Sequence, residues 1–154
     1  MKPIVLIVGA LLFAVLIPLR AHSQGKVLRS VSNDSLEKIL KGMDVKYQRG
    51  ERKEKDVSTT YFDFTRGSLP TRMYNYGNDL WLESTVDKKM TLEDVNRWNA
   101  QAKFSRLVLI EQKDKVTVSL EAQLDCLGGV TEAAIKQFVN RFDQEATKFS
   151  KFVK

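Results

Sequence analysis

Residues 115–131 hold the pattern that decides the fold: Lys-Val-Thr-Val-Ser-Leu-Glu-Ala-Gln-Leu-Asp-Cys-Leu-Gly-Gly-Val-Thr. From Lys115 to Asp125 apolar and polar residues alternate, which is the period of a β-strand with one face in a core and one face in water. Gly128-Gly129 then ends the strand, and Thr131 offers a side-chain oxygen to the first turn of a helix. The stretch therefore predicts a half-buried strand that leads into a helix.

The helix that follows is predicted from a different period. Apolar residues return at spacings of three and four, at Ile135, Phe138, Val139, Phe142, Ala146, Phe149 and Val153. Such a stripe indicates an amphipathic helix of about five turns that lies on the core. Lys148, Lys151 and Lys154 stand near its end, where positive charge suits the helix dipole.

The segment before residue 115 predicts the other arm of a hairpin. Ser105 to Glu111 leads into it through Lys113-Asp114. Leu107 and Leu109 face opposite to Val108 and Ile110, so this arm is apolar on both sides. We expect the strand to be central in the sheet, or its second face to meet a helix or a partner.

Two shorter helices and further strands are predicted towards the N-terminus. One helix covers about residues 35–41, with Ser32-Asn33-Asp34 as N-cap candidates and Gly42 as the left-handed residue near its end. The other begins after Thr91 and ends near Asn99. Strands are predicted at residues 45–49, at 59–65 with a continuation at 72–76, and at 80–86, whereas the charged residues 50–56 predict a solvated turn. The order α-β-β-β-α-β-β-α indicates an α+β fold in which helices pack on an antiparallel sheet of about five strands.

Residues 1–23 predict a secretory signal peptide. Lys2 precedes an apolar run, and the small residues Ala21 and Ser23 favour cleavage between Ser23 and Gln24. An uncleaved anchor is the alternative, but the run is shorter than the ~20 apolar residues of a spanning helix and contains Pro18. We therefore expect residues 24–154 to form a single periplasmic or secreted domain, with no stable membrane insertion after cleavage.

Removal of this segment would limit the chemistry of the chain. His22 is the only histidine, so the remaining domain would have no Ser-His or Cys-His catalysis and no His-ligated zinc. Cys126 is the only cysteine; it cannot form an internal disulfide, and it falls on the apolar side of its strand. We predict no catalytic, cofactor-binding or metal-binding residues and no cofactor. Without Lys2 and Arg20 the net charge falls from +6 to +4 with no basic stripe, so we expect no nucleic-acid partner.

Three segments resemble a known family. They are Val95-Asn96-Arg97-Trp98-Asn99, then Phe104-Ser105-Arg106, and, after the hairpin, Leu127-Gly128-Gly129-Val130-Thr131. They are similar to the YbjN family, which is named as putative bacterial sensory transduction regulators and is similar in fold to the class I chaperones of type III secretion. The resemblance runs from about Ser32 to Phe152. It implies a curved antiparallel sheet backed by helices, no established enzymatic activity, and no catalytic residues.

The leading hypothesis is a non-enzymatic exported module, chaperone-like or regulatory, that binds a protein or peptide partner, with a homodimer as one option. The candidate partner surface consists of Leu107, Val108, Leu109, Ile110, Trp98 and Asn99. For the last two, a structural role is the alternative, in which Trp98 anchors its helix to the sheet and Asn99 caps the helix end.

The alternative hypothesis is a small periplasmic enzyme that uses carboxylates, or a binder of anionic ligands. Asp79 and Glu83 alternate onto one strand face, and such a site needs a pocket in which titratable groups converge. Gly128-Gly129-Val130-Thr131 could form an anion nest, or could be a turn with a helix cap. The aromatic residues Tyr61, Tyr74, Tyr76 and Trp81 could line a groove or form cross-strand pairs in the core.

Overall fold

The structure is a computed structural model that describes residues 25–112 and 115–153. The predicted signal peptide and the cleavage site at Ser23 and Gln24 lie outside the described residues. In chain order the elements are β1 (Val27–Leu28), α1 (Asn33–Gly42), β2 (Tyr47–Glu54), β3 (Val57–Thr65), β4 (Pro70–Asn75), β5 (Asp79–Val86), α2 (Leu92–Gln101), β6 (Arg106–Gln112), β7 (Lys115–Asp125), β8 (Val130–Thr131) and α3 (Glu132–Phe152). No helix in this part of the chain is long and apolar enough to span a membrane.

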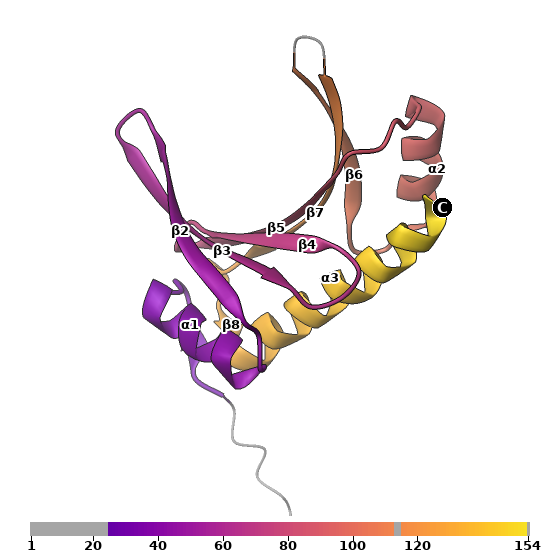
Figure 1. The fold of residues 1–154 in the computed structure, drawn as a ribbon. Helices are drawn as coiled ribbons and strands as arrows, with labels where there is room; N and C mark the ends of the chain where they lie inside the picture. The colour runs from indigo at the N-terminus through magenta and orange to yellow at the C-terminus, as the bar shows by residue number, and fades with distance from the viewer. Residues whose placement is uncertain (1–24, 113–114, 154) are drawn as a thin grey trace, which may run out of the picture.

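The main sheet has six antiparallel strands in the order β2-β3-β4-β5-β7-β6, and β1 pairs with β8 in a separate ribbon. The sheet is curved, with the β2–β3 and β6–β7 hairpins rising on either side and α3 crossing beneath (Figure 1). The α+β class and the antiparallel sheet are as predicted, while the strands are more numerous than the five expected.

The C-terminal helix covers the core side of the sheet. Thr131 caps it by accepting a hydrogen bond from the Ala134 backbone nitrogen at 3.2 Å. Its buried stripe consists of Ile135, Phe138, Val139, Phe142, Glu145, Ala146 and Phe149, so the predicted periodicity is confirmed apart from Glu145, and Val153 is half-buried. The stripe meets apolar side chains of the sheet, among them Phe62, Met73, Leu82 and Leu120, which are all fully buried.

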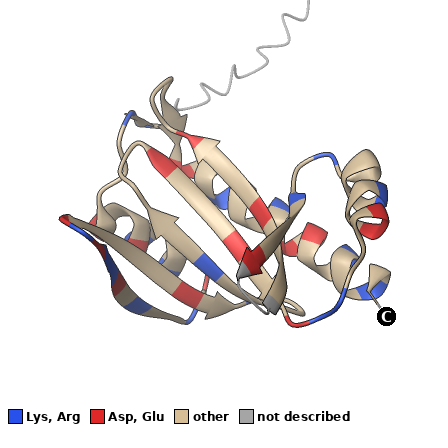
Figure 2. Cartoon of the chain, turned by 90° about the horizontal axis from the view of Figure 1, so that it is seen from above, with Lys and Arg blue, Asp and Glu red and all other residues tan. Residues whose placement is uncertain are grey.

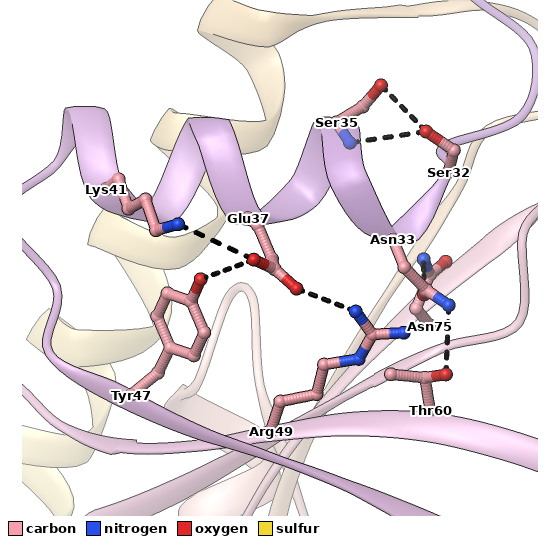
Figure 3. A network of polar contacts seen from close by, with 9 residues as sticks. All are labelled: Ser32, Asn33, Ser35, Glu37, Lys41, Tyr47, Arg49, Thr60 and Asn75. Carbon is pink, nitrogen blue, oxygen red and sulfur yellow. Dashed lines mark hydrogen bonds and ion pairs between the residues drawn. The ribbon is translucent and has the colours of Figure 1, made fainter.

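Helix α1 is tied to the sheet by a network of polar contacts (Figure 3). Ser32 is its N-cap and accepts from the Ser35 nitrogen at 3.2 Å, as one of the predicted candidates. Glu37 accepts hydrogen bonds from the Tyr47 hydroxyl at 2.9 Å and from Arg49 at 2.8 Å. These bonds hold the pKa of Glu37 below its ordinary value. Helix α1 is thereby fixed against the first strand of the sheet.

The structure corrects four details of the sequence-based expectation. The charged stretch predicted as a turn continues β2 as far as Glu54, because an exposed hairpin arm has water on both faces and needs no apolar side. The left-handed residue after α1 is Asp44, with φ of 57°, rather than Gly42. Strand β6 pairs only with β7, so it is an edge strand and not a central one. Helix α2 runs on to Gln101, so Asn99 does not end it.

Candidate functional site: the open face of the sheet

One face of the sheet is covered by the helices, whereas no helix of the described residues lies over the other (Figure 1). We call this second side the open face. Strand alternation assigns to it the side chains that point away from the buried apolar ones. They include Tyr61, Asp63, Arg72, Tyr74, Trp81, Glu83, Thr85, Ser119, Glu121, Arg106, Val108 and Ile110.

A row of five charged residues crosses the open face at right angles to the strands. The pairing register sets Asp63, Arg72, Glu83, Glu121 and Arg106 side by side on β3, β4, β5, β7 and β6, and we call this the charged row. In Figure 2, which looks onto this side of the sheet, acidic and basic bands lie next to each other on neighbouring strands. The residues are far apart in sequence, so only the strand pairing brings them together.

The ends of the charged row form ion pairs. Arg72 donates two hydrogen bonds to Asp63, from Nε to Oδ1 at 2.7 Å and from its Nη2 to Oδ2 at 2.8 Å. This bidentate geometry raises the pKa of Arg72 above its ordinary value. At the other end, Arg106 donates to Oε2 of Glu121 at 3.3 and 3.4 Å.

The centre of the charged row brings two carboxylates together. Glu83 stands directly opposite Glu121 on the neighbouring strand, an arrangement that is unfavourable for like charges. Glu83 accepts a hydrogen bond from the Tyr74 hydroxyl at 3.1 Å. Burial raises the pKa of Glu83 above its ordinary value, and the charge of Glu121 adds to the rise, while the bond from Tyr74 opposes it. The row thus contains three carboxylates and two guanidinium groups.

An aromatic row runs beside the charged row. Tyr61, Tyr74 and Trp81 are neighbours on β3, β4 and β5. The guanidinium carbon of Arg72 lies 3.9 Å from the ring centre of Tyr61, and that of Arg106 lies 5.2 Å from the ring centre of Trp81. Gly50 gives Tyr61 its space, because a Cβ at this position would lie 2.4 Å from the Tyr61 ring. Aromatic rings and guanidinium groups are therefore stacked along the open face.

A hollow of about 730 Å³ opens beside the charged row. Asp63, Arg72, Glu83 and Thr85 line it together with the ends of β2, β3 and β4. The hollow is shallow and polar, as expected for a surface that receives part of a larger molecule rather than an enclosed small ligand.

Comparisons with known proteins agree with this architecture. The profile of the YbjN family, described as "Putative bacterial sensory transduction regulator", matches residues 32–154. The chain belongs to the YbjN family. A solved structure, "Crystal structure of YbjN, a putative transcription regulator from E. coli", superposes with a TM-score of 0.60 at 14% sequence identity. The match covers 76% of this chain and 87% of that chain, and it shows that the two share a fold. No curated protein sequence matches the chain.

The YbjN domain places the six residues of the predicted partner surface in different environments. Val108 and Ile110 lie half-buried on the open face, whereas Leu107 and Leu109 point to the core. Trp98 is buried, with its ring 5.2 Å from that of Phe149 on α3. It therefore anchors α2 to α3, where the sequence had suggested an anchor to the sheet.

Asn99 completes the edge of β6 in the YbjN domain. Its Oδ1 accepts from the Leu107 nitrogen at 2.7 Å, and its Nδ2 donates to the Leu107 carbonyl at 3.1 Å. The side-chain amide thus occupies the position of a neighbouring strand at this one residue. The sequence indicated that Asn99 had a structural role, but as a helix cap, because its distance from Leu107 in space was unknown.

The carboxylates suggested for acid–base chemistry do not form the expected pair. Asp79 and Glu83 share a face of β5, but Asp79 accepts from the Gln123 amide at 3.2 Å while Glu83 faces Glu121. Glu121 was predicted to be solvated, yet it is only 7% exposed. No group of three metal-ligating side chains occurs in residues 25–112 and 115–153. The Glu83–Glu121 pair depends on the register between β5 and β7, and this register could not be predicted from the sequence.

Other sequence candidates have structural roles in the YbjN domain. Thr131 caps α3, and the Gly129 nitrogen donates to the Cys126 carbonyl at 2.9 Å, so this nitrogen is not free for an anion. Cys126 is fully buried as predicted, and burial raises the pKa of its thiol. Tyr61, Tyr74 and Trp81, which could have been core or groove, lie on the open face.

Proposed function

We propose that this YbjN-family chain is a non-enzymatic binding module that acts outside the cytoplasm and receives an extended segment of a protein partner on the open face of its sheet. The observation that carries the proposal is the stacked array of tyrosine, tryptophan and arginine side chains on a face that no described helix covers. These three residue types are the ones that carry most of the binding energy at protein interfaces.

The array is held in place before any partner arrives. Arg72 is fixed by two bonds to Asp63, and the Tyr74 hydroxyl accepts from Arg52 at 3.3 Å while it donates to Glu83. Tyr76 stacks on Tyr74 at a ring distance of 6.1 Å and is 54% exposed. Side chains that are already ordered lose little conformational entropy on binding, which favours affinity.

The shape of the sheet also supports an extended partner. The β2–β3 and β6–β7 hairpins rise on either side of β4 and β5, so the sheet is concave on the open face (Figure 1). A segment in extended conformation presents every second side chain to the sheet on which it lies. Val108 and Ile110 on β6 add apolar contact area at one side of the open face. The proposed location outside the cytoplasm rests on the signal-peptide pattern of residues 1–23.

Site-specific photo-crosslinking tests this proposal in bacterial cells that export the full chain. A photoreactive residue is placed at Thr85 or at Ile110 on the open face, and at Leu92 on α2 as a control, because Leu92 is 65% exposed. We expect one partner to be crosslinked from both open-face positions and not from Leu92. We expect Trp81→Ala to remove the crosslinks, because Trp81 is a half-buried ring of the array, with Arg106 stacked on it.

The outcomes separate the possible occupants. Crosslinks between two copies of the chain would identify a homodimer on the open face. Crosslinking from Leu92 alone, or equal crosslinking from all three positions, would contradict the proposal. N-terminal sequencing of the exported protein tests the compartment, since a chain that starts at Gln24 is the expected product and a chain that retains residues 1–23 in the cytoplasm is not.

A further inference from the structure

We infer that the partner segment presents a basic side chain, lysine or arginine, to Glu83 and Glu121 at the centre of the charged row. The inference deepens the proposed function and rests on it. Its first support is the composition of the charged row, in which each of the two guanidinium groups already has its own carboxylate. Arg72 is bound to Asp63 and Arg106 to Glu121. In the described part of the chain, Glu83 has a hydrogen bond from a neutral hydroxyl and no ion pair.

Burial makes this arrangement unfavourable within the chain alone. Glu121 is 7% exposed, and Glu83, directly opposite, is half-buried. Two neighbouring carboxylates that are partly removed from water repel each other and lose hydration. The positive charge of Arg72, directly across the strand from Glu83, offsets only part of this cost, since burial still leaves the pKa of Glu83 raised. A cation placed between the two carboxylates would offset both effects, so the site is complementary to a positive charge and not to an anion.

A separate observation points to a ligand at the same place. The hydroxyl of Ser119 is fully buried and has no hydrogen-bond partner among the described residues. Ser119 stands two residues before Glu121 on β7, so its side chain points to the same face. Buried hydroxyls are nearly always hydrogen-bonded in folded proteins. A hydroxyl can accept a bond from a cation, so Ser119 would supply a third acceptor on this face once a bound segment displaced the side chains that bury it.

The surroundings suit a long basic side chain rather than a bare ion. An ammonium group has three donors and a guanidinium group has five, which matches the acceptors of Glu83, Glu121 and Ser119. The half-buried ring of Trp81 lies in the next row of the same face, where it can contact the aliphatic stem. Because an extended segment presents alternate side chains to the sheet, its backbone can cross the open face while one basic residue reaches the charged row.

Peptide pools provide the test, with the full chain isotopically labelled and observed by NMR. Three pools of hexapeptides with blocked, uncharged ends have lysine, arginine or norleucine fixed at the third position and threonine, valine, serine or glutamine elsewhere. We expect the lysine and arginine pools to shift the backbone signals of Glu83, Ser119 and Glu121. The norleucine pool should bind at least about tenfold more weakly.

Matched variants make the test specific for the two carboxylates. Glu83→Gln and Glu121→Gln should each weaken binding of the lysine pool about tenfold, whereas Glu111→Gln should leave it unchanged, because Glu111 points to the other side of β6. Ser119→Ala provides a fourth variant without a change of charge, and it should weaken binding less than the loss of either carboxylate. Thermal unfolding of each variant shows whether it is folded.

The outcomes separate this inference from the proposed function. If the norleucine pool bound the open face as tightly as the lysine pool, the face would bind peptides but the inference about charge would be wrong. If butylammonium alone bound as tightly as the lysine pool, the ligand would be a small organic cation and not a protein segment. If no pool shifted any signal of the open face, both the inference and the proposed function would be contradicted.

Discussion

The two faces of the sheet differ in how completely their polar side chains are paired within the chain. On the covered face, Asn75 is only 8% exposed, yet its amide donates to Asn33 at 2.7 Å (Figure 3). The same amide donates to the Val31 carbonyl at 3.0 Å and accepts from the Gly77 nitrogen at 2.9 Å. On the open face, two carboxylates face each other, and one of them, Glu83, forms no ion pair with any described residue. The Asn75 network, which holds the fold, is therefore satisfied within the chain, although the buried indole nitrogen of Trp98 has no hydrogen-bond partner among the described residues. We interpret the incompletely paired carboxylates of the open face as part of a surface that another molecule completes.

The largest expected loss of stability comes from removing a buried side chain on the covered face. Phe142 on α3 is 1% exposed, and replacement by alanine would remove a large buried side chain and leave a cavity. We expect Phe142→Ala to lower the free energy of unfolding by about 3–5 kcal/mol, measured by urea denaturation. Leu127→Ala is the control, because Leu127 is 59% exposed and should change stability little. Equal losses in the two variants would show that α3 does not cover the core as described.

Loss of the Asn75 network on the covered face should cause the second-largest decrease in the free energy of unfolding. Asn75→Ala removes three hydrogen bonds and leaves the Val31 carbonyl without its donor. We expect a loss of about 2 kcal/mol in the free energy of unfolding. Asn78→Ala, in the turn that follows, is the control, because Asn78 is exposed. If Asn75→Ala were as stable as the control, water would be replacing the network and the contrast between the two faces would fail.

Much of the covered face could be predicted from the sequence. The alternation of residues 115–125 and the helical stripe that begins at Ile135 are local periodic signals, and each specifies which side of its element is buried. The caps Ser32, Thr91 and Thr131 were also predicted, because capping depends on residues within one turn of each other.

The open face could not be predicted in the same way. The pair Glu83–Glu121 depends on which strands are neighbours and in which register, and this follows from the packing of the whole chain. The order β5-β7-β6 places a later hairpin strand beside β5, so β6 lies at the edge although its sequence is apolar on both sides. Asn99 shows the same limit, since its contact with Leu107 joins a helix to a strand edge.

Removing the charge of Glu83 from the charged row should change the free energy of unfolding by a smaller amount. The change should be a gain in stability, unlike the two losses expected on the covered face. Because the pKa of Glu83 is raised in the folded state, the folded chain binds more protons than the unfolded chain just above the ordinary pKa of a glutamate. Stability therefore falls as the pH rises through the raised pKa. We expect Glu83→Gln to stabilise the protein by less than ~1 kcal/mol at neutral pH, with the difference disappearing in acid.

Urea unfolding between about pH 4 and about pH 7 measures this difference. Glu111→Gln is the control, because Glu111 is exposed and lies off the open face. If Glu83→Gln were less stable than the original chain at neutral pH, Glu83 would already be compensated within the protein. The open face would then lack the unpaired charge that distinguishes it from the covered face.

The smallest change in stability is expected where the open face is most crowded. Gly50→Ala would place a Cβ against the outer end of the Tyr61 ring, so the ring would have to shift towards solvent. We expect the free energy of unfolding to change by less than ~0.5 kcal/mol, because the gain in strand propensity over glycine offsets part of the steric cost. The stack of Arg72 on Tyr61 should nevertheless be lost, which the ring-current shifts of the Arg72 side chain would report by NMR. Gly128→Ala, with no atom near its Cβ, should change neither quantity. A large loss of stability in Gly50→Ala would mean that Tyr61 is as firmly packed as the core, and the open face would then belong to the fold rather than to a partner.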